Sequence, residues 1–259
     1  MMKKGLLLID RGSREQEVKD ELEYLCYSLK ERGDYACTEY CFLEVIPPTI
    51  SDGIIKCLEN NIDTLTIVPY FLYPGKKVKA AVTEAMNLQK NTQAKFFVTR
   101  LLNLHPTMIE IADDRIREAL MNNHVDLASK DVDVLIVGHG SKDPNAKTAL
   151  DYVREGLSQK YRNVTQCFLE IEEPNIRQGF DICEKNNPKI LVVMIYFLHK
   201  GAHVKRDISD DMEPVLKKSK INKVVVTKHI GMDPKMIELV LKRADEVERT
   251  FLPKIMTEN

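Results

Sequence analysis

The stretch Cys41-Phe42-Leu43-Glu44 returns as Cys167-Phe168-Leu169-Glu170, 126 positions further along the chain. Other residues match at spacings of 126 or 128: Pro48 with Pro174, Gly53 with Gly179, Cys57 with Cys183, Tyr70–Leu72 with Tyr196–Leu198, and Gly12-Ser13 with Gly140-Ser141. So many matches at nearly constant spacing predict two homologous halves. We expect one domain over residues 1–124 and a second over residues 125–259, joined at the polar stretch Asn122–Asp131.

Each half alternates strand and helix patterns. In the second half, strands are predicted at 132–137, 164–169, 190–198 and 223–227, with helices after Asp143 and Pro174, over 204–216 and after Pro234. The first half repeats this order, with strands at 5–9, 38–43, 64–71 and 96–98. Continuously apolar strands that alternate with helices predict parallel sheets covered on both faces. The expected fold class is therefore α/β, with two homologous doubly wound parallel-sheet domains.

The composition excludes several classes of protein. The formal net charge is −1 and there is no tryptophan, so generic nucleic-acid binding and base-stacking surfaces are not expected. The longest apolar run, 190–198, is far shorter than the roughly 20 residues of a membrane span. Asp10 and Arg11 interrupt the apolar amino-terminal run before it reaches the length of a signal sequence. We expect a cytoplasmic protein, not bound to membranes, whose six cysteines are reduced core residues.

Ligands of doubly wound folds bind at the carboxyl ends of the strands. In the second half these ends carry four features: Gly138-His139-Gly140-Ser141, Glu170, the segment 199–203 with two histidines, and His229. Two imidazoles and a carboxylate are typical ligands of a divalent transition metal in an open site. His139, His203 and Glu170 are the predicted metal ligands. A single histidine at a strand end is more often an ordinary hydrogen-bonded or exposed residue.

A comparison of the two halves bears on these alternatives. Arg11 stands where His139 stands, and Lys77 stands where His203 stands, whereas Glu44 matches Glu170. A metal role confined to the second half explains why both histidine positions differ together. Independent drift of two surface positions would explain the same difference.

At this point a resemblance becomes specific. Gly138-His139-Gly140-Ser141, Phe168-Leu169-Glu170 with Pro174, and the segment 201–208 follow one another in an order that resembles the class II tetrapyrrole chelatases. More closely, the pattern is similar to the sirohydrochlorin cobalt- and ferrochelatases, and the resemblance covers nearly the whole chain. The chain departs from the long two-domain members in one respect. Those members carry the histidine motifs in the amino-terminal half, so the active half would here have switched.

The resemblance implies an enzyme that inserts Co²⁺ or Fe²⁺ into sirohydrochlorin for cobalamin or sirohaem biosynthesis, with cobalt favoured. His139 and His203 would bind and deliver the metal, and Glu170 would complete the coordination or accept a pyrrole proton. No permanently bound cofactor is expected, because the metal is a substrate. Sirohydrochlorin is the expected partner, and the protein would act as a monomer or a homodimer.

The substrate of such an enzyme carries many carboxylates, which basic side chains can bind. Arg11 and Lys77, together with Ser141 and Lys205, are the substrate-binding candidates. Arg14, Lys76 and Lys79 extend this basic group, and an ordinary solvated basic face is the alternative.

Three other functions were weighed against the chelatase. A nucleotide enzyme lacks support, because there is no Gly-x-Gly-x-x-Gly or glycine-lysine phosphate loop. A histidine phosphatase would require an arginine beside His139, where Gly138 stands. A non-catalytic carrier of metal or tetrapyrrole could use the same residues, and sequence alone separates it poorly from an enzyme.

Overall fold

The structure is a computed structural model that describes the backbone of residues 2–199 and 201–257. Within these ranges, the side chains of 202–209 and 252–257 lie outside the description. The first half runs through β1 (Lys4–Asp10), α1 (Gln16–Arg32), β2 (Cys37–Phe42), α2 (Ile50–Leu58), β3 (Thr64–Pro69), α3 (Lys76–Gln89), β4 (Lys95–Val98) and α4 (Pro106–Asn122).

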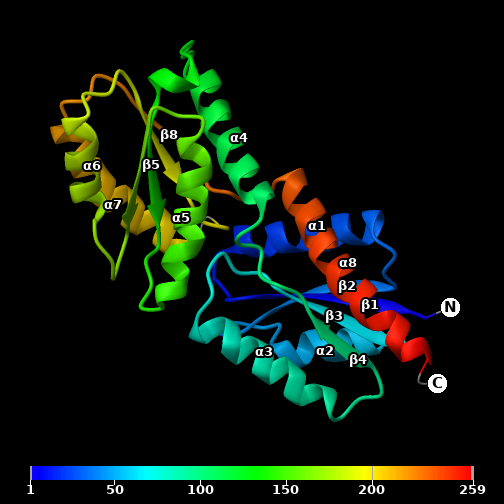
Figure 1. Cartoon of the computed structure of the whole chain (residues 1–259). Helices are drawn as coiled ribbons and strands as arrows, with labels where there is room; N and C mark the ends of the chain where they lie inside the picture. Colours follow the sequence, from blue (N-terminus) through cyan, green and yellow to red (C-terminus); the bar gives the residue numbers. More distant parts are fainter. Residues whose placement is uncertain (1, 200, 258–259) are drawn as a thin grey trace. The chain divides into compact units, whose positions relative to one another are not determined.

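The second half repeats this order after a short 3-10 helix at Ser129–Asp131. Its elements are β5 (Asp133–Gly138), α5 (Pro144–Ser158), β6 (Asn163–Phe168), α6 (Ile176–Lys185), β7 (Leu191–Ile195), α7 (Ala202–Lys218), β8 (Val224–Val226) and α8 (Pro234–Thr257). The strands form two four-stranded sheets of orders β2-β1-β3-β4 and β6-β5-β7-β8, and all their pairings are parallel. The predicted fold class is confirmed, and Figure 1 shows the two sheets with their helices.

Each sheet is buried on both faces, which explains the continuously apolar strands. In β1, Leu7 and Ile9 pack in one cluster with residues of α2 and α3. Leu6 and Leu8 alternate with them, are also fully buried, and therefore face the opposite side of the sheet. Helices α1 and α8 lie against each other and against β2 and β3 respectively. Burying each such leucine stabilises the fold by about 1.5–3 kcal/mol.

The last helix of each half covers the sheet of the other half. Helix α4 follows β4 in the chain but packs against α5, β7 and β8, whereas α8 packs against α1, β3 and β4. The compact units are accordingly Met1–Asn103 with Met232–Asn259, and Leu104–Gly231. The predicted division at residues 124 and 125 follows the repeat in the sequence. The repeat shows which segments are homologous, but it contains no information about which sheet a terminal helix will cover.

Most element positions agree with the predictions, and the differences have local causes. Asp143 caps α5 through its side chain, with Pro144 as the first helical residue. Helix α6 begins two residues after Pro174, because Asn175 and Gln178 form a reciprocal capping box there. Strand β7 ends at Ile195, whereas the sequence predicts a strand as far as residue 198. The prediction is too long because Tyr196 and Phe197 are also buried, and apolar character alone does not separate a buried strand from the buried loop after it.

Two further expectations concern the class of protein. All six cysteines are buried and none forms a disulfide, as predicted. Burial raises the pKa of the Cys183 thiol to about 11, which keeps it protonated at neutral pH. Among the described residues, no helix combines the length and apolar character that crossing a membrane would require.

Candidate metal centre

The predicted site residues of the second half come from loops at one edge of its sheet. His139 follows β5, Glu170 lies two residues after β6, and His229 lies three residues after β8. Position 203 is in the first turn of α7, which follows β7. Because all four strands are parallel, their carboxyl ends share this edge, as expected from the sequence.

The side chain of His139 is half-buried and held from two sides. Its Nδ1 lies 3.2 Å from the carbonyl oxygen of Gly140. A carbonyl oxygen can only accept a hydrogen bond, so this contact requires the tautomer with the proton on Nδ1. In that tautomer Nε2 carries a lone pair, the form in which a neutral imidazole binds a metal. The ring of Phe197, just after β7, lies against the imidazole at a centroid distance of 6.2 Å.

The loops of His139 and Glu170 are joined through their backbones. The N–H of Glu170 donates to the carbonyl oxygen of His139 over 3.0 Å, and that of Leu169 donates to Gly138 over 2.9 Å. Gly140 adopts φ +89° and lies so close to the Glu170 carbonyl that a Cβ would come within 1.9 Å of its oxygen. Only glycine fits this position. The glycine beside His139 therefore allows the two predicted ligands to occupy neighbouring loops.

The residue after the glutamate is strained in both halves. Ile171 has φ +71° and Val45 has φ +82°, values that β-branched side chains rarely adopt. In each loop the following N–H closes back on the glutamate carbonyl, from Glu172 to Glu170 over 2.7 Å and from Ile46 to Glu44 over 3.1 Å. Such strain costs about 1–3 kcal/mol and persists only where the surroundings impose it. The backbone that presents the glutamate is thus fixed in the same form in both halves.

In the first half, the three positions that match the predicted ligands meet in space. Arg11 Nε lies 3.1 Å from Glu44 Oε1, and Lys77 Nζ lies 2.5 Å from Glu44 Oε2. The hydrogen bond from Lys77, followed by that from Arg11, holds the pKa of the Glu44 carboxyl below its usual value. Two loop side chains, Arg11 and Glu44, and Lys77 from the first turn of α3 therefore converge at the carboxyl edge of this sheet.

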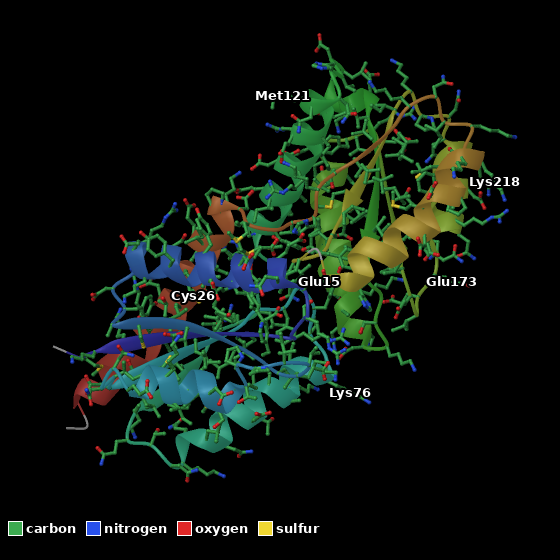
Figure 2. All side chains as sticks on the ribbon, turned by 180° about the vertical axis from the view of Figure 1, so that it is seen from behind. Glu15, Cys26, Lys76, Met121, Glu173 and Lys218 are labelled. Carbon is green, nitrogen blue, oxygen red and sulfur yellow. The ribbon has the colours of Figure 1, made fainter. Side chains whose placement is uncertain are left out.

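This contact revises the interpretation of the basic residues. The sequence predicts that Arg11 and Lys77 either bind substrate carboxylates or form a solvated basic face. The structure shows that both pair with Glu44, although their side chains remain 53% and 54% exposed. Lys76, labelled in Figure 2, is the first residue of α3 and is also exposed.

The third predicted ligand, His203, and the substrate candidate Lys205 have side chains outside the described residues. Among the side chains that the structure does describe, no group of three histidine, cysteine or acidic residues lies close enough to hold an ion. The predicted set of His139, Glu170 and His203 includes one member outside that description, so it stays a prediction. Ser141 has a local role, because its Oγ accepts a hydrogen bond from the N–H of Asp143 over 3.0 Å.

Glu172 is a residue that the sequence reasoning missed. Its Oε1 accepts a hydrogen bond of 2.8 Å from the backbone N–H of Ser141, so it links the Glu170 loop to the His139 loop. A signal was present in the sequence, because Ile46 occupies the matching position in the first half. Glu172 thus differs between the halves together with the two histidine positions.

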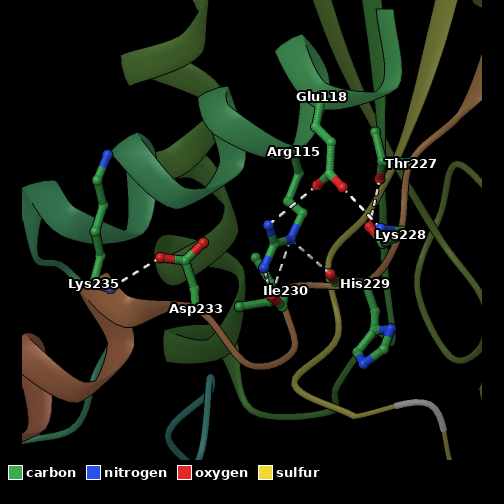
Figure 3. A network of polar contacts seen from close by, with 8 residues as sticks. All are labelled: Arg115, Glu118, Thr227, Lys228, His229, Ile230, Asp233 and Lys235. Carbon is green, nitrogen blue, oxygen red and sulfur yellow. Dashed lines mark hydrogen bonds and ion pairs between the residues drawn. The ribbon is translucent and has the colours of Figure 1, made fainter. Parts of the chain in front are cut away.

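A network of polar contacts surrounds the fourth loop, which carries His229 (Figure 3). Arg115 of α4 donates to the carbonyl oxygens of His229 and Ile230, with its shortest contact, to Ile230, at 2.7 Å. The imidazole of His229 projects away from this network. Arg243 of α8 makes the matching contact, 3.1 Å long, to the carbonyl of Asn103 in the first half. Because both halves have it, this arginine contact belongs to the common scaffold.

Comparison with known proteins supports the division of the chain into two homologous halves. The CbiX family matches residues 5–119 and again residues 133–247. A sirohydrochlorin cobaltochelatase of Priestia megaterium is 27% identical over 253 residues, which cover 94% of this chain and 79% of the relative. A sirohydrochlorin ferrochelatase of the same organism is also 27% identical, over 81% of this chain and 78% of the relative.

Solved structures show the same fold. SirB from Bacillus subtilis with Fe³⁺ superposes with a TM-score of 0.82 at 20% identity, covering 95% of this chain and 96% of that one. The sirohydrochlorin chelatase SirB of Bacillus subtilis subspecies spizizenii in complex with cobalt gives a TM-score of 0.78 at 19% identity, covering 97% and 98%. At 19–20% identity, these superpositions show a common fold only.

Proposed function

The chain belongs to the CbiX family, and on that premise we propose that it is a chelatase that inserts a divalent metal ion into sirohydrochlorin. Co²⁺ is the proposed preferred metal and Fe²⁺ the alternative, for cobalamin or sirohaem biosynthesis respectively. Relatives named for each metal are equally identical to this chain, at 27%. His139, Glu170 and His203 are the proposed metal ligands, all in the second half.

The observation that carries this proposal is the contact among Arg11, Glu44 and Lys77. Their positions match His139, Glu170 and His203, and in the first half both cations pair with the Glu44 carboxylate, Arg11 at 3.1 Å and Lys77 at 2.5 Å. The backbone link between the first two loops is the same in both halves. We infer that the second half brings His203 to Glu170 as the first half brings Lys77 to Glu44.

The chemistry of these groups suits metal insertion. A free tetrapyrrole holds two N–H protons that must leave as the metal enters, so a base beside the macrocycle assists the exchange. Glu170 is exposed and can accept such a proton. Two imidazoles and a carboxylate hold a divalent ion in an open site, which leaves positions for the incoming nitrogens. His139, in the tautomer that its contact with Gly140 requires, presents Nε2 to the ion.

Recognition of the substrate is assigned to basic and polar groups. Arg11 and Lys77 are proposed to bind its carboxylates. Because both cations pair with Glu44, the substrate carboxylates would compete with the Glu44 carboxylate for them. An arginine can bind a carboxylate through two parallel hydrogen bonds, and a lysine adds a mobile charge. Lys205 and Ser141 remain further proposed contacts. The proposed active form is a monomer or a homodimer.

The test is a spectrophotometric assay of metal insertion into metal-free sirohydrochlorin with Co²⁺ or Fe²⁺. We expect multiple turnovers with the wild-type protein and a loss of about 100-fold or more in His139→Ala and His203→Ala. His124→Asn is the matched control, because this exposed histidine lies at the end of α4 at φ +52°, a conformation that asparagine tolerates.

Each outcome is informative. Conversion that stops at one equivalent of metal per chain would support a carrier instead of an enzyme. Conversion no faster than the protein-free background, with folded protein, would contradict the chelatase. Equal activity of the two histidine variants and the control would place the site elsewhere.

A further inference from the structure

The turn after the first strand of each half carries Arg11 or His139. A side-chain carboxylate holds this turn in both halves, but the carboxylate comes from a different position in each. In the first half, Asp10 at the end of β1 accepts a hydrogen bond of 2.8 Å from the N–H of Gly12. The matching residue in the second half is Gly138, which has no side chain to offer. There, Glu172 accepts a hydrogen bond of 2.8 Å from the N–H of Ser141. The donor also differs, because Gly12 matches Gly140, so the second-half turn is held one residue later and by a carboxylate of the neighbouring loop.

This difference has a mechanical consequence. Asp10 and Gly12 belong to the same turn, so the hydrogen bond between them does not link that turn to the Glu44 loop. Glu172 lies two residues from Glu170, so its carboxylate fastens the His139 turn to the loop that presents Glu170. Together with the hydrogen bond from the Glu170 N–H to the His139 carbonyl, it holds the turn on both sides of Gly140. Glu172 thus ties the two loops that carry the proposed ligands at a point beyond their backbone hydrogen bonds.

The backbone contacts between the two loops are shared by the halves. Both have the backbone hydrogen bond from the glutamate, the glycine packed on the glutamate carbonyl, and the positive φ that follows. Shared contacts serve the scaffold. The Glu172 contact occurs only where the histidines occur, and Ile46 takes its place where Arg11 and Lys77 stand.

We propose that Glu172 is a positioning residue that sets the distance between His139 and Glu170 for metal binding. This inference rests on the proposed function. Glu172 acts through its hydrogen bond to the Ser141 N–H, and it is neither a ligand nor a base. A hydrogen bond from a backbone N–H to a carboxylate is short and about twice as strong as a neutral one. Groups that orient metal ligands contribute about 10–100-fold to metal affinity.

The test compares three variants of the full chain. Glu172→Ile introduces the residue found at the matching position of the first half, Ile46, and removes the acceptor. Glu172→Gln removes the charge but keeps a carbonyl oxygen that can accept the same hydrogen bond. Glu173→Gln is the matched control, because it removes one charge from the same loop at an exposed side chain. Figure 2 labels Glu173.

Two readouts are taken, and the first needs no metal. Hydrogen exchange of the peptide covering residues 139–143 should be fastest in Glu172→Ile, intermediate in Glu172→Gln, whose neutral hydrogen bond is weaker, and unchanged in Glu173→Gln. In the second readout the protein is titrated with Co²⁺ alone and binding is monitored by the visible absorption of the bound ion. The dissociation constant should be about tenfold larger for Glu172→Ile than for wild type. Glu172→Gln should stay within about threefold of wild type, since the hydrogen bond remains.

The outcomes separate this inference from the proposed function. If Glu172→Gln weakens Co²⁺ binding as much as Glu172→Ile does, the charge matters and the positioning role is wrong. The same holds if Glu172→Ile binds Co²⁺ and exchanges hydrogen as the wild type does. If the wild-type protein binds no Co²⁺, the proposed function fails, while the exchange readout still decides whether Glu172 holds the turn.

Discussion

Two pairs of loops correspond between the halves: those after β1 and β2, and those after β5 and β6. Their backbone contacts are the same, but the side chains that accompany the glutamate differ. Both pairs hold a glutamate by the same N–H contact and pack a glycine on its carbonyl. In one pair the glutamate is neutralised by Arg11 and Lys77. In the other, its neighbours in the sequence repeat are histidines. The shared backbone fixes the position of the glutamate in its loop. The neighbouring side chains can therefore differ between the halves without moving it.

The comparison also shows which contacts belong to the scaffold. The arginines Arg115 and Arg243 hold corresponding loops in the two halves through backbone carbonyls. Each has a glutamate partner three residues later, Glu118 at 3.3 Å and Glu246 at 3.0 Å. A contact present in both halves belongs to the common scaffold, whatever the loops bind. A contact found in one half, such as that of Glu172, is the better candidate for function.

The largest expected effect comes from the two matched glutamates. Glu170→Gln should lower kcat/KM for metal insertion by about 100-fold or more, because an amide neither accepts the pyrrole proton nor binds the ion as a carboxylate does. Glu44→Gln removes only exposed ion pairs and should cost less than about threefold. Steady-state insertion kinetics measure both. Equal losses in the two variants would show that both halves take part in the chemistry.

A gain of binding would sharpen the comparison further. The double substitution Arg11→His with Lys77→His places two imidazoles around Glu44, at positions that already converge on it. We expect the stoichiometry of bound Co²⁺ to rise from one to two ions per chain, measured by equilibrium dialysis. The added site should be weaker than the native one, because Ile46 cannot supply the contact that Glu172 makes.

The control for this gain is a third substitution. Adding Glu44→Gln to the double variant should return the stoichiometry to one ion per chain. A second ion that persists in the triple variant would show that it binds away from these loops.

The smallest expected effect is on stability against pH. Hydrogen bonds from Lys77 and Arg11 lower the pKa of Glu44, so the folded state binds this proton less readily than the unfolded chain. The contribution is therefore complete above the unfolded pKa of about 4.3 and disappears as the pH falls through the lower folded value. The side chains of Arg11 and Lys77 are more than half exposed and Glu44 is half-buried, so solvent screens the pairs and the contribution amounts to less than about 1 kcal/mol.

Urea denaturation of wild type and Glu44→Gln at pH 6 and pH 3 tests this. The difference in the free energy of unfolding should be present at pH 6 and shrink toward zero at pH 3. A difference that is the same at both pH values would contradict the role of the ion pairs.

The sequence predicts much of the candidate site because parallel strands place their carboxyl ends at one edge. His139 and Glu170 lie in adjacent, hydrogen-bonded loops, as the strand-end argument requires. The same argument could not find Glu172, since a glutamate beside a strand end has no pattern that distinguishes a backbone acceptor from a solvated charge. It also did not predict that Arg11 and Lys77 pair with Glu44, because an ion pair between residues 33 positions apart depends on how two loops and the start of α3 fold together.

The sequence by itself determined the repeat, the two parallel α/β sheets and the residue types available at the strand ends. These follow from local periodicity and from the matched spacing of the halves, which are properties of the chain as a string. Only the tertiary structure decided that α4 and α8 exchange sheets, that Arg11 and Lys77 converge on Glu44, and that Glu172 ties two loops together. Each of these depends on the packing of segments far apart in the chain, where several partners satisfy the same pattern and only the folded geometry selects one.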